Sequence, residues 1–302
     1  MVDVAADRAA AVDDTGTPAA DDTDAVTSAD EADSFDAEKV MYDQPALLDA
    51  ALAKLAPPRP GRPDLYVVAF AGDGSEDVFR NEVEYAGRLF ARRFDAAGHV
   101  LVLENNPATV ATQPLATWTN LHRALGAIAG RMDPAEDILL LYLTTHGSAD
   151  HELLVDLDPL PLDQIEPVDI ADALKTTPAI RWKVLVVNAC YSGGFIDALR
   201  DDSTLVMTSA RTDRTSFGCG VDSDITYFGR AFLVDALNQT TSLRDAFDLA
   251  KKSVLEWEDA DKQEHSEPQI ATSPSIEAKL ADWRQRLVER PNVPFQPAAK
   301  SR

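Results

Sequence analysis

Short apolar runs alternate along the chain with segments whose apolar residues recur at helical spacing. The expected strands read LYVVAF (65–70), HVLVL (99–103), ILLLYLTT (138–145), KVLVVNA (183–189) and TLVMTSA (204–210), with HELLVDL and QIAT as shorter candidates. The expected inner faces of two intervening helices are Val83, Leu89, Phe90 and Phe94, and Leu121, Leu125 and Ile128. This alternation predicts a doubly wound α/β fold, with a mostly parallel sheet and helices on both faces.

The pattern also suggests how the chain is divided. We expect one α/β domain over residues 61–290, ending in a helix over 276–289. Residues 1–60 are interpreted as an acidic disordered tail with a helix over 46–56 and the Pro-rich linker PPRPGRPD, and residues 291–302 as a disordered C-terminus.

Charge narrows the choice of partners. The 302-residue chain has a formal net charge of −23, and residues 1–43 hold thirteen acidic residues against two basic ones. So acidic a surface repels phosphate backbones and anionic lipid, which disfavours nucleic acid and membrane surfaces as partners.

The sequence also bears on the compartment. No apolar run approaches the roughly 20 residues that span a bilayer, and the N-terminus lacks the basic and apolar regions of a secretory signal. We therefore expect a cytoplasmic protein. Two cysteines in this length do not form a disulfide framework.

Two of the strongest apolar runs end in reactive residues. ILLLYLTT leads into His146 and Gly147, and KVLVVNA leads into Cys190. Because sites in open parallel sheets form beyond the carboxyl ends of the strands, the imidazole and the thiol emerge at one edge if these strands are neighbours. A thiolate is then the nucleophile and the histidine its base, with the N–H groups of Gly147 and Cys190 as oxyanion donors.

Each residue alone has a simpler interpretation. A single cysteine at a buried strand end usually behaves as a small hydrophobe, and a single histidine after a strand is usually a loop residue. Their occurrence at matching strand ends, each near glycine, favours a dyad. A metal site is not indicated, because the other histidines share no ligand spacing with either cysteine and no CxxC motif is present.

These motifs carry a family resemblance. The strand into His146-Gly147 and the strand into Asn-Ala-Cys190-Tyr-Ser-Gly resemble the caspase-like clan of cysteine peptidases. Within that clan, LVMTSARTDRTSFGCGVDSDITYFGRAF resembles the bacterial members of the C13, or legumain-like, family. The resemblance extends over roughly residues 64–273.

The resemblance implies a caspase–haemoglobinase fold and hydrolysis of protein or peptide substrates through a thioester, without metal or organic cofactor. It makes Cys190 the nucleophile and His146 the general acid and base, with an oxyanion hole from Gly147 and Cys190. The asparagine that orients the histidine in legumain aligns with Val78, and Asp77 beside it is the candidate substitute.

The resemblance also implies a substrate pocket. Arg80 and Ser216 match pocket residues of legumain-like enzymes. Asparagine-specific members carry acids at the positions that here read Asn188 and Arg230. The expected P1 residue, on the N-terminal side of the scissile bond, is therefore Asn or Asp, with Asp favoured if Arg80 and Arg230 both point inward.

Alternatives remain open at this point. The same acyl-enzyme serves transamidation, and the altered pocket also fits a caspase-like binding scaffold. A flavodoxin-like domain is disfavoured because FAGDG lacks the spacing of a nucleotide fingerprint. Cys219 is interpreted as a structural thiol and His151 as a solvated loop residue. The sequence does not indicate an oligomeric state.

Overall fold

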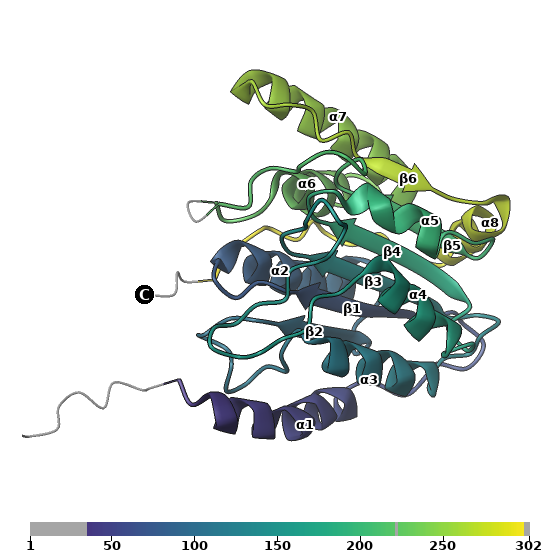
Figure 1. Ribbon diagram of the computed structural model, residues 1–302. Helices are drawn as coiled ribbons and strands as arrows, with labels where there is room; N and C mark the ends of the chain where they lie inside the picture. Colours follow the sequence, from purple (N-terminus) through teal and green to yellow (C-terminus); the bar gives the residue numbers. More distant parts are fainter. Residues whose placement is uncertain (1–34, 221–222, 299–302) are drawn as a thin grey trace, which may run out of the picture. The chain divides into compact units, whose positions relative to one another are not determined.

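A six-stranded sheet forms the centre of the structure, a computed structural model that describes residues 35–220 and 223–298 (Figure 1). Its strand order is β2-β1-β3-β4-β5-β6, and only the β5–β6 pairing is antiparallel. The strands are β1 (Leu65–Ala71), β2 (Val100–Glu104), β3 (Ile138–Thr144), β4 (Trp182–Asn188), β5 (Thr204–Thr208) and β6 (Gln269–Ala271). The chain reverses direction across the sheet between β1 and β3, which is where doubly wound folds place their sites.

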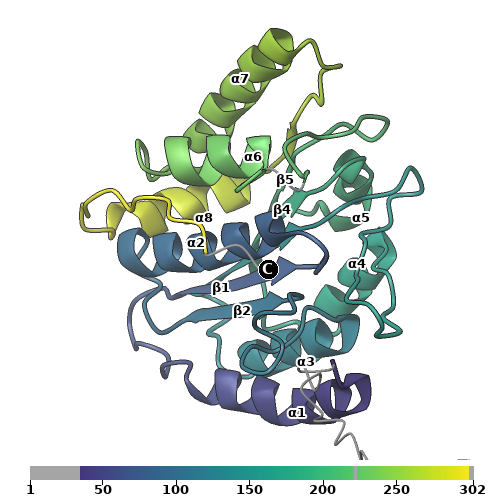
Figure 2. The same cartoon turned by 90° about the vertical axis from the view of Figure 1, so that its left-hand side faces the viewer.

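Helices cover both faces of the sheet (Figure 2). Because successive strand residues point to opposite faces, Val67 and Ala69 belong to one apolar core and Val68 and Phe70 to the other. The first core contains residues of α2 (Asp77–Arg93), α6 (Tyr227–Gly229), the π-helix η2 (Arg230–Ala236), α7 (Leu243–Asp261) and α8 (Pro274–Gln285). The second contains residues of α1 (Ala37–Ala53), α3 (Trp118–Ala129), α4 (Pro167–Lys175), the 3₁₀ turn η1 (Ser192–Phe195) and α5 (Ile196–Leu199).

This architecture confirms the predicted fold class. The apolar faces expected in α2 and α3 are fully buried, including Val83 and Leu125. HELLVDL does not form a strand: Leu153 makes only isolated bridges to Gly147 and Ile165. The last helix is shorter than expected, since α8 ends at Gln285.

The boundaries of the folded unit differ from the expected ones. The compact unit begins at Ala37, because α1 buries Leu48 and Leu52 in the core that it shares with α3. At the other end, Val293 is 4 % exposed, and its backbone N–H donates to Asn238 Oδ1 at 2.8 Å. The C-terminal segment is thus ordered at Val293. Most of the proposed acidic tail, residues 1–34, and residues 299–302 lie outside the described part of the chain.

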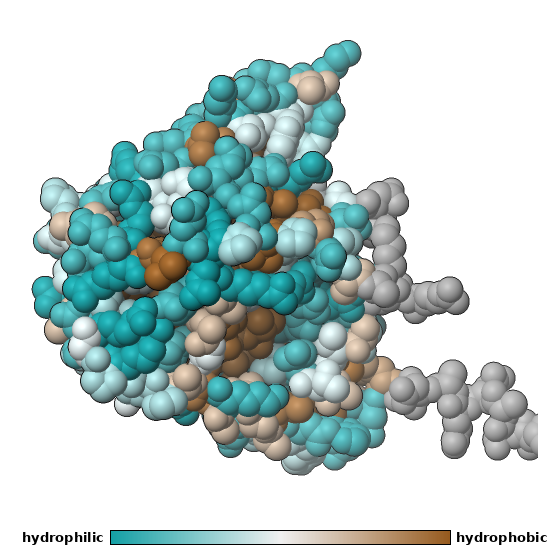
Figure 3. Space-filling view, turned by 180° about the vertical axis from the view of Figure 1, so that it is seen from behind, coloured by the Kyte–Doolittle hydropathy of each residue, from teal (hydrophilic) through white to brown (hydrophobic). Residues whose placement is uncertain are grey.

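The surface is mainly polar. The face in Figure 3 is largely hydrophilic, and its apolar side chains form small, separate patches. Among the residues that the structure describes, no helix combines the length and the apolar character needed to cross a bilayer.

Glu104, the last residue of β2, makes folding stability depend on pH. Burial raises the pKa of its carboxyl group from 4.5 to about 7. From pH 4.5 to about 7 the unfolded chain loses this proton while the folded chain keeps it, so stability falls as the pH rises through that window. We expect Glu104→Gln to remove this loss and to be more stable than the parent at pH 8 by up to about 3 kcal/mol.

Urea unfolding of both proteins at pH 5 and pH 8 measures the difference. Glu256→Gln is the matched control, because the Glu256 side chain is 63 % exposed. If the free energies of unfolding of Glu104→Gln and its parent differ by the same amount at both pH values, the raised pKa of Glu104 is contradicted.

Candidate active site

His146 and Cys190 occupy equivalent positions on adjacent strands. In the parallel β3–β4 pair, Thr144 lies opposite Asn188, and each reactive residue follows two positions later. The backbone N–H of Thr145 still donates to the Asn188 carbonyl at 3.2 Å, so the pairing persists up to the site. Parallel neighbours lie about 4.8 Å apart. His146 and Cys190 therefore leave neighbouring strands at the same edge of the sheet.

The Cys190 thiol is half-buried and faces the loop after β5. Its Sγ accepts a hydrogen bond from the backbone N–H of Ser216 at 3.3 Å and lies 3.7 Å from the Ser216 hydroxyl. The thiol can also donate to the Ser216 carbonyl oxygen, which lies 3.6 Å from Sγ. Ser216, expected in the substrate pocket, is thus a direct neighbour of Cys190.

The other cysteine lies in a different environment. Both cysteines are free, and burial raises the pKa of Cys219 to about 11, with the nearby Cys190 adding to the effect. At neutral pH this thiol is almost wholly protonated and a poor nucleophile. That environment agrees with a structural thiol.

The imidazole of His146 is held by two acidic residues. Its Nε2 lies 3.2 Å from Glu76 Oε2 and 3.4 Å from Asp73 Oδ2. The Phe79 ring packs against it nearly perpendicularly, with the ring centroids 5.1 Å apart. The tautomer with its proton on Nε2 can donate to either carboxylate and leaves a lone pair on Nδ1.

Neither acid was singled out from the sequence. Asp77, the expected candidate, is 3.4 Å from Arg80, and its Oδ1 accepts from Asn106 at 3.0 Å. Asp73 and Glu76 belong to GDGSED, directly after the apolar run of β1. A polar stretch at a strand end was the available signal, but the choice among its acids depends on the turn before α2.

Gly147 lies against the backbone of Cys190. A Cβ added to it would fall inside van der Waals contact with the Cys190 carbonyl oxygen. Only glycine allows the two motifs to approach so closely.

We expect Gly147→Ala to lower kcat/KM by about 100- to 1,000-fold, the range for loss of one oxyanion donor. The added methyl must push the Cys190 carbonyl away and displace both N–H groups. Steady-state cleavage of a peptide substrate measures the effect. Gly126→Ala in α3 is the control, because no heavy atom lies within 4 Å of its added Cβ. Unchanged kinetics in Gly147→Ala would contradict the oxyanion role.

Asn188 lies beneath the site and not on a substrate-facing surface. It is 2 % exposed, and its Nδ2 donates to Glu82 Oε1 at 2.6 Å and to Thr226 Oγ1 at 2.8 Å. Glu82 also accepts from the Tyr142 hydroxyl at 2.7 Å. The amide expected to contact substrate instead ties β4 to α2 and to the N-cap of α6.

The two pocket arginines have different surroundings. Arg80 is 3 % exposed and donates to Asn106 Oδ1 at 2.9 Å. The Arg230 side chain is 63 % exposed, and its guanidinium lies over the Trp257 ring, 5.7 Å from the centroid. Arg230 lines a surface groove with Trp257 and Phe295. Arg80 and Arg230 therefore do not both point inward, and that was the condition for favouring Asp at P1.

His151 is engaged rather than solvated. Its Nδ1 lies 3.1 Å from the carbonyl oxygen of Tyr191, which directly follows Cys190 and has a positive φ of 56°. A Cβ on Gly194 would clash with the His151 ring. This histidine supports the turn that follows Cys190.

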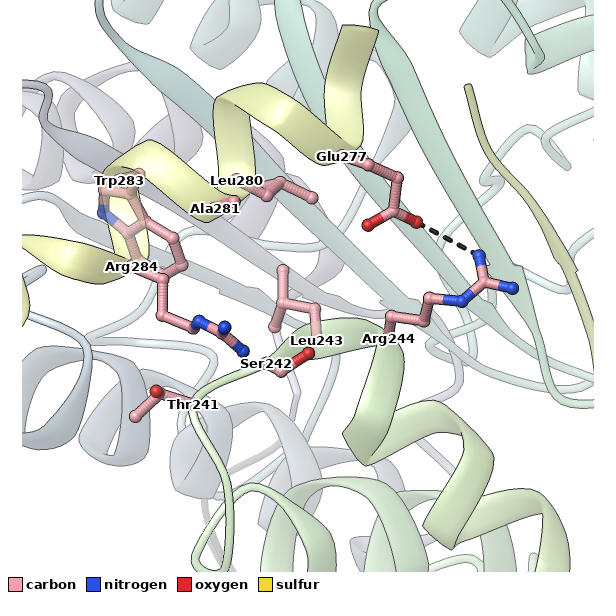
Figure 4. A pocket seen from close by; sticks show the side chains of 9 residues that line it. All are labelled: Thr241, Ser242, Leu243, Arg244, Glu277, Leu280, Ala281, Trp283 and Arg284. Atoms are coloured by element: carbon pink, nitrogen blue, oxygen red, sulfur yellow. Dashed lines mark hydrogen bonds and ion pairs between the residues drawn. The ribbon is translucent and has the colours of Figure 1, made fainter. Parts of the chain in front are cut away.

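One further pocket is a seam between helices (Figure 4). It lies between the start of α7 and α8 and is bridged by Arg244 and Glu277 at 3.1 Å. None of the expected site residues lines it, so we attribute it to the packing of these two helices.

Comparison with known proteins gives a family match. The model of the peptidase C13 family matches residues 122–278, a range that includes both His146 and Cys190. No curated protein sequence matches the chain. Among solved structures, caspase-1 from Spodoptera frugiperda matches with a TM-score of 0.48 and 14 % sequence identity, over 70 % of this chain and 86 % of that one.

Proposed function

This chain belongs to the peptidase C13 family and is a cysteine-type peptidase, and on that premise we propose that it cleaves proteins or peptides internally through a thioester on Cys190. The observation that carries the proposal is the β3–β4 register, in which Thr144 pairs with Asn188 and each reactive residue follows two positions later. A half-buried thiol beside an oriented imidazole is the arrangement that cysteine nucleophiles require.

The proposed reaction has two steps. The Cys190 sulfur attacks the scissile carbonyl carbon while His146 Nδ1 accepts the thiol proton. The carbonyl oxygen becomes an oxyanion that accepts from the N–H groups of Gly147 and Cys190. Collapse breaks the C–N bond, and His146 gives its proton to the leaving amine. Water, deprotonated by the same nitrogen, then hydrolyses the thioester and restores the thiol.

Glu76 and Asp73 act on this reaction through His146. By accepting the Nε2 proton they fix the tautomer in which Nδ1 has a free lone pair, and they stabilise the imidazolium that forms during acylation. They are positioning residues, since neither is proposed to touch the substrate.

For P1 we propose Asn or Asp. Ser216 provides a polar group beside Cys190. The Arg80 guanidinium, which is 3 % exposed and donates to Asn106 Oδ1, would bind the P1 side chain only once substrate uncovers it. With Arg230 over Trp257, charge complementarity from two arginines no longer favours Asp over Asn.

The test is cleavage of a peptide library by the full-length protein, with the cut bonds identified by mass spectrometry. We expect cuts after Asn or Asp that disappear in Cys190→Ala. Cuts after Lys or Arg would refute the proposed P1 preference without contradicting the roles of Cys190 and His146. Adding an amine nucleophile separates hydrolysis from transamidation by the mass of the product. No cleavage of any peptide would favour the scaffold alternative.

A further inference from the structure

Three ligand-type side chains meet where β1 and β3 end. His146 Nε2 and carboxylate oxygens of Glu76 and Asp73 all lie within 4.8 Å of one another. We propose that these three residues bind a divalent transition-metal ion, Zn²⁺ above all, and that the bound ion reversibly inhibits the peptidase. The inhibition rests on the proposed function, whereas the binding does not.

The spacing of the ligand atoms fits the ion. Zn²⁺ binds imidazole nitrogen and carboxylate oxygen at about 2.0–2.2 Å in tetrahedral geometry, so its ligands lie about 3.3–3.6 Å apart. The distances from His146 Nε2 to Glu76 Oε2 and Asp73 Oδ2 are 3.2 and 3.4 Å. An ion can replace the shared proton with small shifts of the side chains. One imidazole and two carboxylates leave a fourth position for water.

The ligands are held in place by their surroundings. The Asp73 side chain is 2 % exposed, and its Oδ1 accepts from the Ser75 N–H at 2.8 Å, which leaves Oδ2 for the ion. Glu76 is the N-cap residue of α2, yet its side chain makes no capping hydrogen bond and turns to His146 instead. Partners that orient ligands in this way are typical of metal sites.

The charge balance also favours a dication. Two carboxylates share a single imidazole, which offsets at most one negative charge. Asp156 places a third acid close by, because its backbone forms an isolated β-bridge with Asp73. A divalent ion neutralises both ligand carboxylates at once.

Inhibition follows from the tautomer. The ion takes the Nε2 lone pair of a neutral imidazole, so the one remaining ring proton must lie on Nδ1. Nδ1 then has no lone pair with which to accept the proton of the Cys190 thiol. The thiol remains in place while its base is lost, and removal of the ion by a chelator restores activity.

The test is Zn²⁺ titration of the full-length, chelator-stripped protein by isothermal titration calorimetry. We expect one site whose Kd rises about 100-fold in Glu76→Gln, since loss of even an orienting partner costs 10- to 100-fold. Asp156→Asn is the control with the same charge change, and we expect its Kd to stay within about threefold of the parent, because a charge that is not a ligand acts only through space. Circular dichroism verifies that both variants are folded. Absence of binding, or equal affinity in Glu76→Gln, would overturn the site.

Cobalt(II) distinguishes this site from binding at the nucleophile. With nitrogen and oxygen ligands we expect weak visible bands that are the same in the parent and in Cys190→Ala. A strong near-ultraviolet thiolate band that disappears in Cys190→Ala would place the ion on the sulfur and refute the proposal. If the protein binds Zn²⁺ but its metal-free form cleaves no peptide, the proposed peptide cleavage is refuted and the metal site is not. Cleavage that Zn²⁺ does not inhibit, despite binding, would refute the inhibitory role.

Discussion

Cys190→Ala is expected to lower kcat/KM for peptide cleavage by at least about 10,000-fold, because removal of a catalytic nucleophile leaves only binding and the oxyanion donors. The fold should not change. Cys190 is half-buried at the sheet edge, and the hydrogen bonds of its sulfur are weak ones to Ser216 alone among the described residues. Progress curves with a cleavable peptide, together with a thermal melt, measure both effects.

Cys219 provides the matched control. Cys219→Ser removes the chain's other thiol, whose pKa burial raises to about 11, and is expected to leave kcat/KM within about threefold of the parent. Alkylation at pH 7.5 should then label Cys190 far faster than Cys219 in the parent protein. Preferential labelling of Cys219, or full activity in Cys190→Ala, would show that the nucleophile is assigned wrongly.

Glu82→Ala is expected to lower the free energy of unfolding by about 4 kcal/mol, the scale for breaking a buried polar network by removing one member. Glu82 is fully buried and accepts from Tyr142 on β3, Asn188 on β4 and Thr226 before α6. Its removal leaves the donors of three buried residues without their shared acceptor and opens a cavity beneath the site. Urea denaturation measures the difference in free energy of unfolding, with the dependence of that free energy on urea concentration taken as equal in the two proteins.

Glu84→Ala is the control for this effect. Glu84 lies on the same helix, its side chain is 30 % exposed, and its partner is Arg88 at 3.5 Å. An exposed pair of this kind contributes about 0.3–0.5 kcal/mol. If the two variants unfold at similar urea concentrations, the Glu82 network does not stabilise the fold in the way proposed.

The placement of His146 and Cys190 at one edge of the sheet was accessible from the sequence, because it depends on strand order and little else. A run such as ILLLYLTT must be a buried strand, and a parallel neighbour ending in Asn-Ala-Cys190 brings thiol and imidazole to one edge. The inner faces of α2 and α3 followed from helical spacing for a similar reason, since burial of an apolar stripe is a local property of the pattern.

The polar surroundings of the site could not be predicted in this way. Glu82 is an acidic residue of α2 that becomes fully buried only because β3, β4 and Thr226 all present donors to it. Arg230 turns outward because Trp257, far along the chain, offers a ring face. The burial of Glu82 and the orientation of Arg230 thus depend on partners that are distant in the sequence.

The sequence by itself determined the sheet, the helices that cover it, and the edge at which Cys190 and His146 emerge, because apolar periodicity encodes burial one element at a time. The tertiary structure alone decided which acids hold His146 and which arginine is buried. It also turned Asn188 to Glu82 beneath the site. Hydrogen bonds and charges act between groups brought together from separate elements, and no local pattern records those distances.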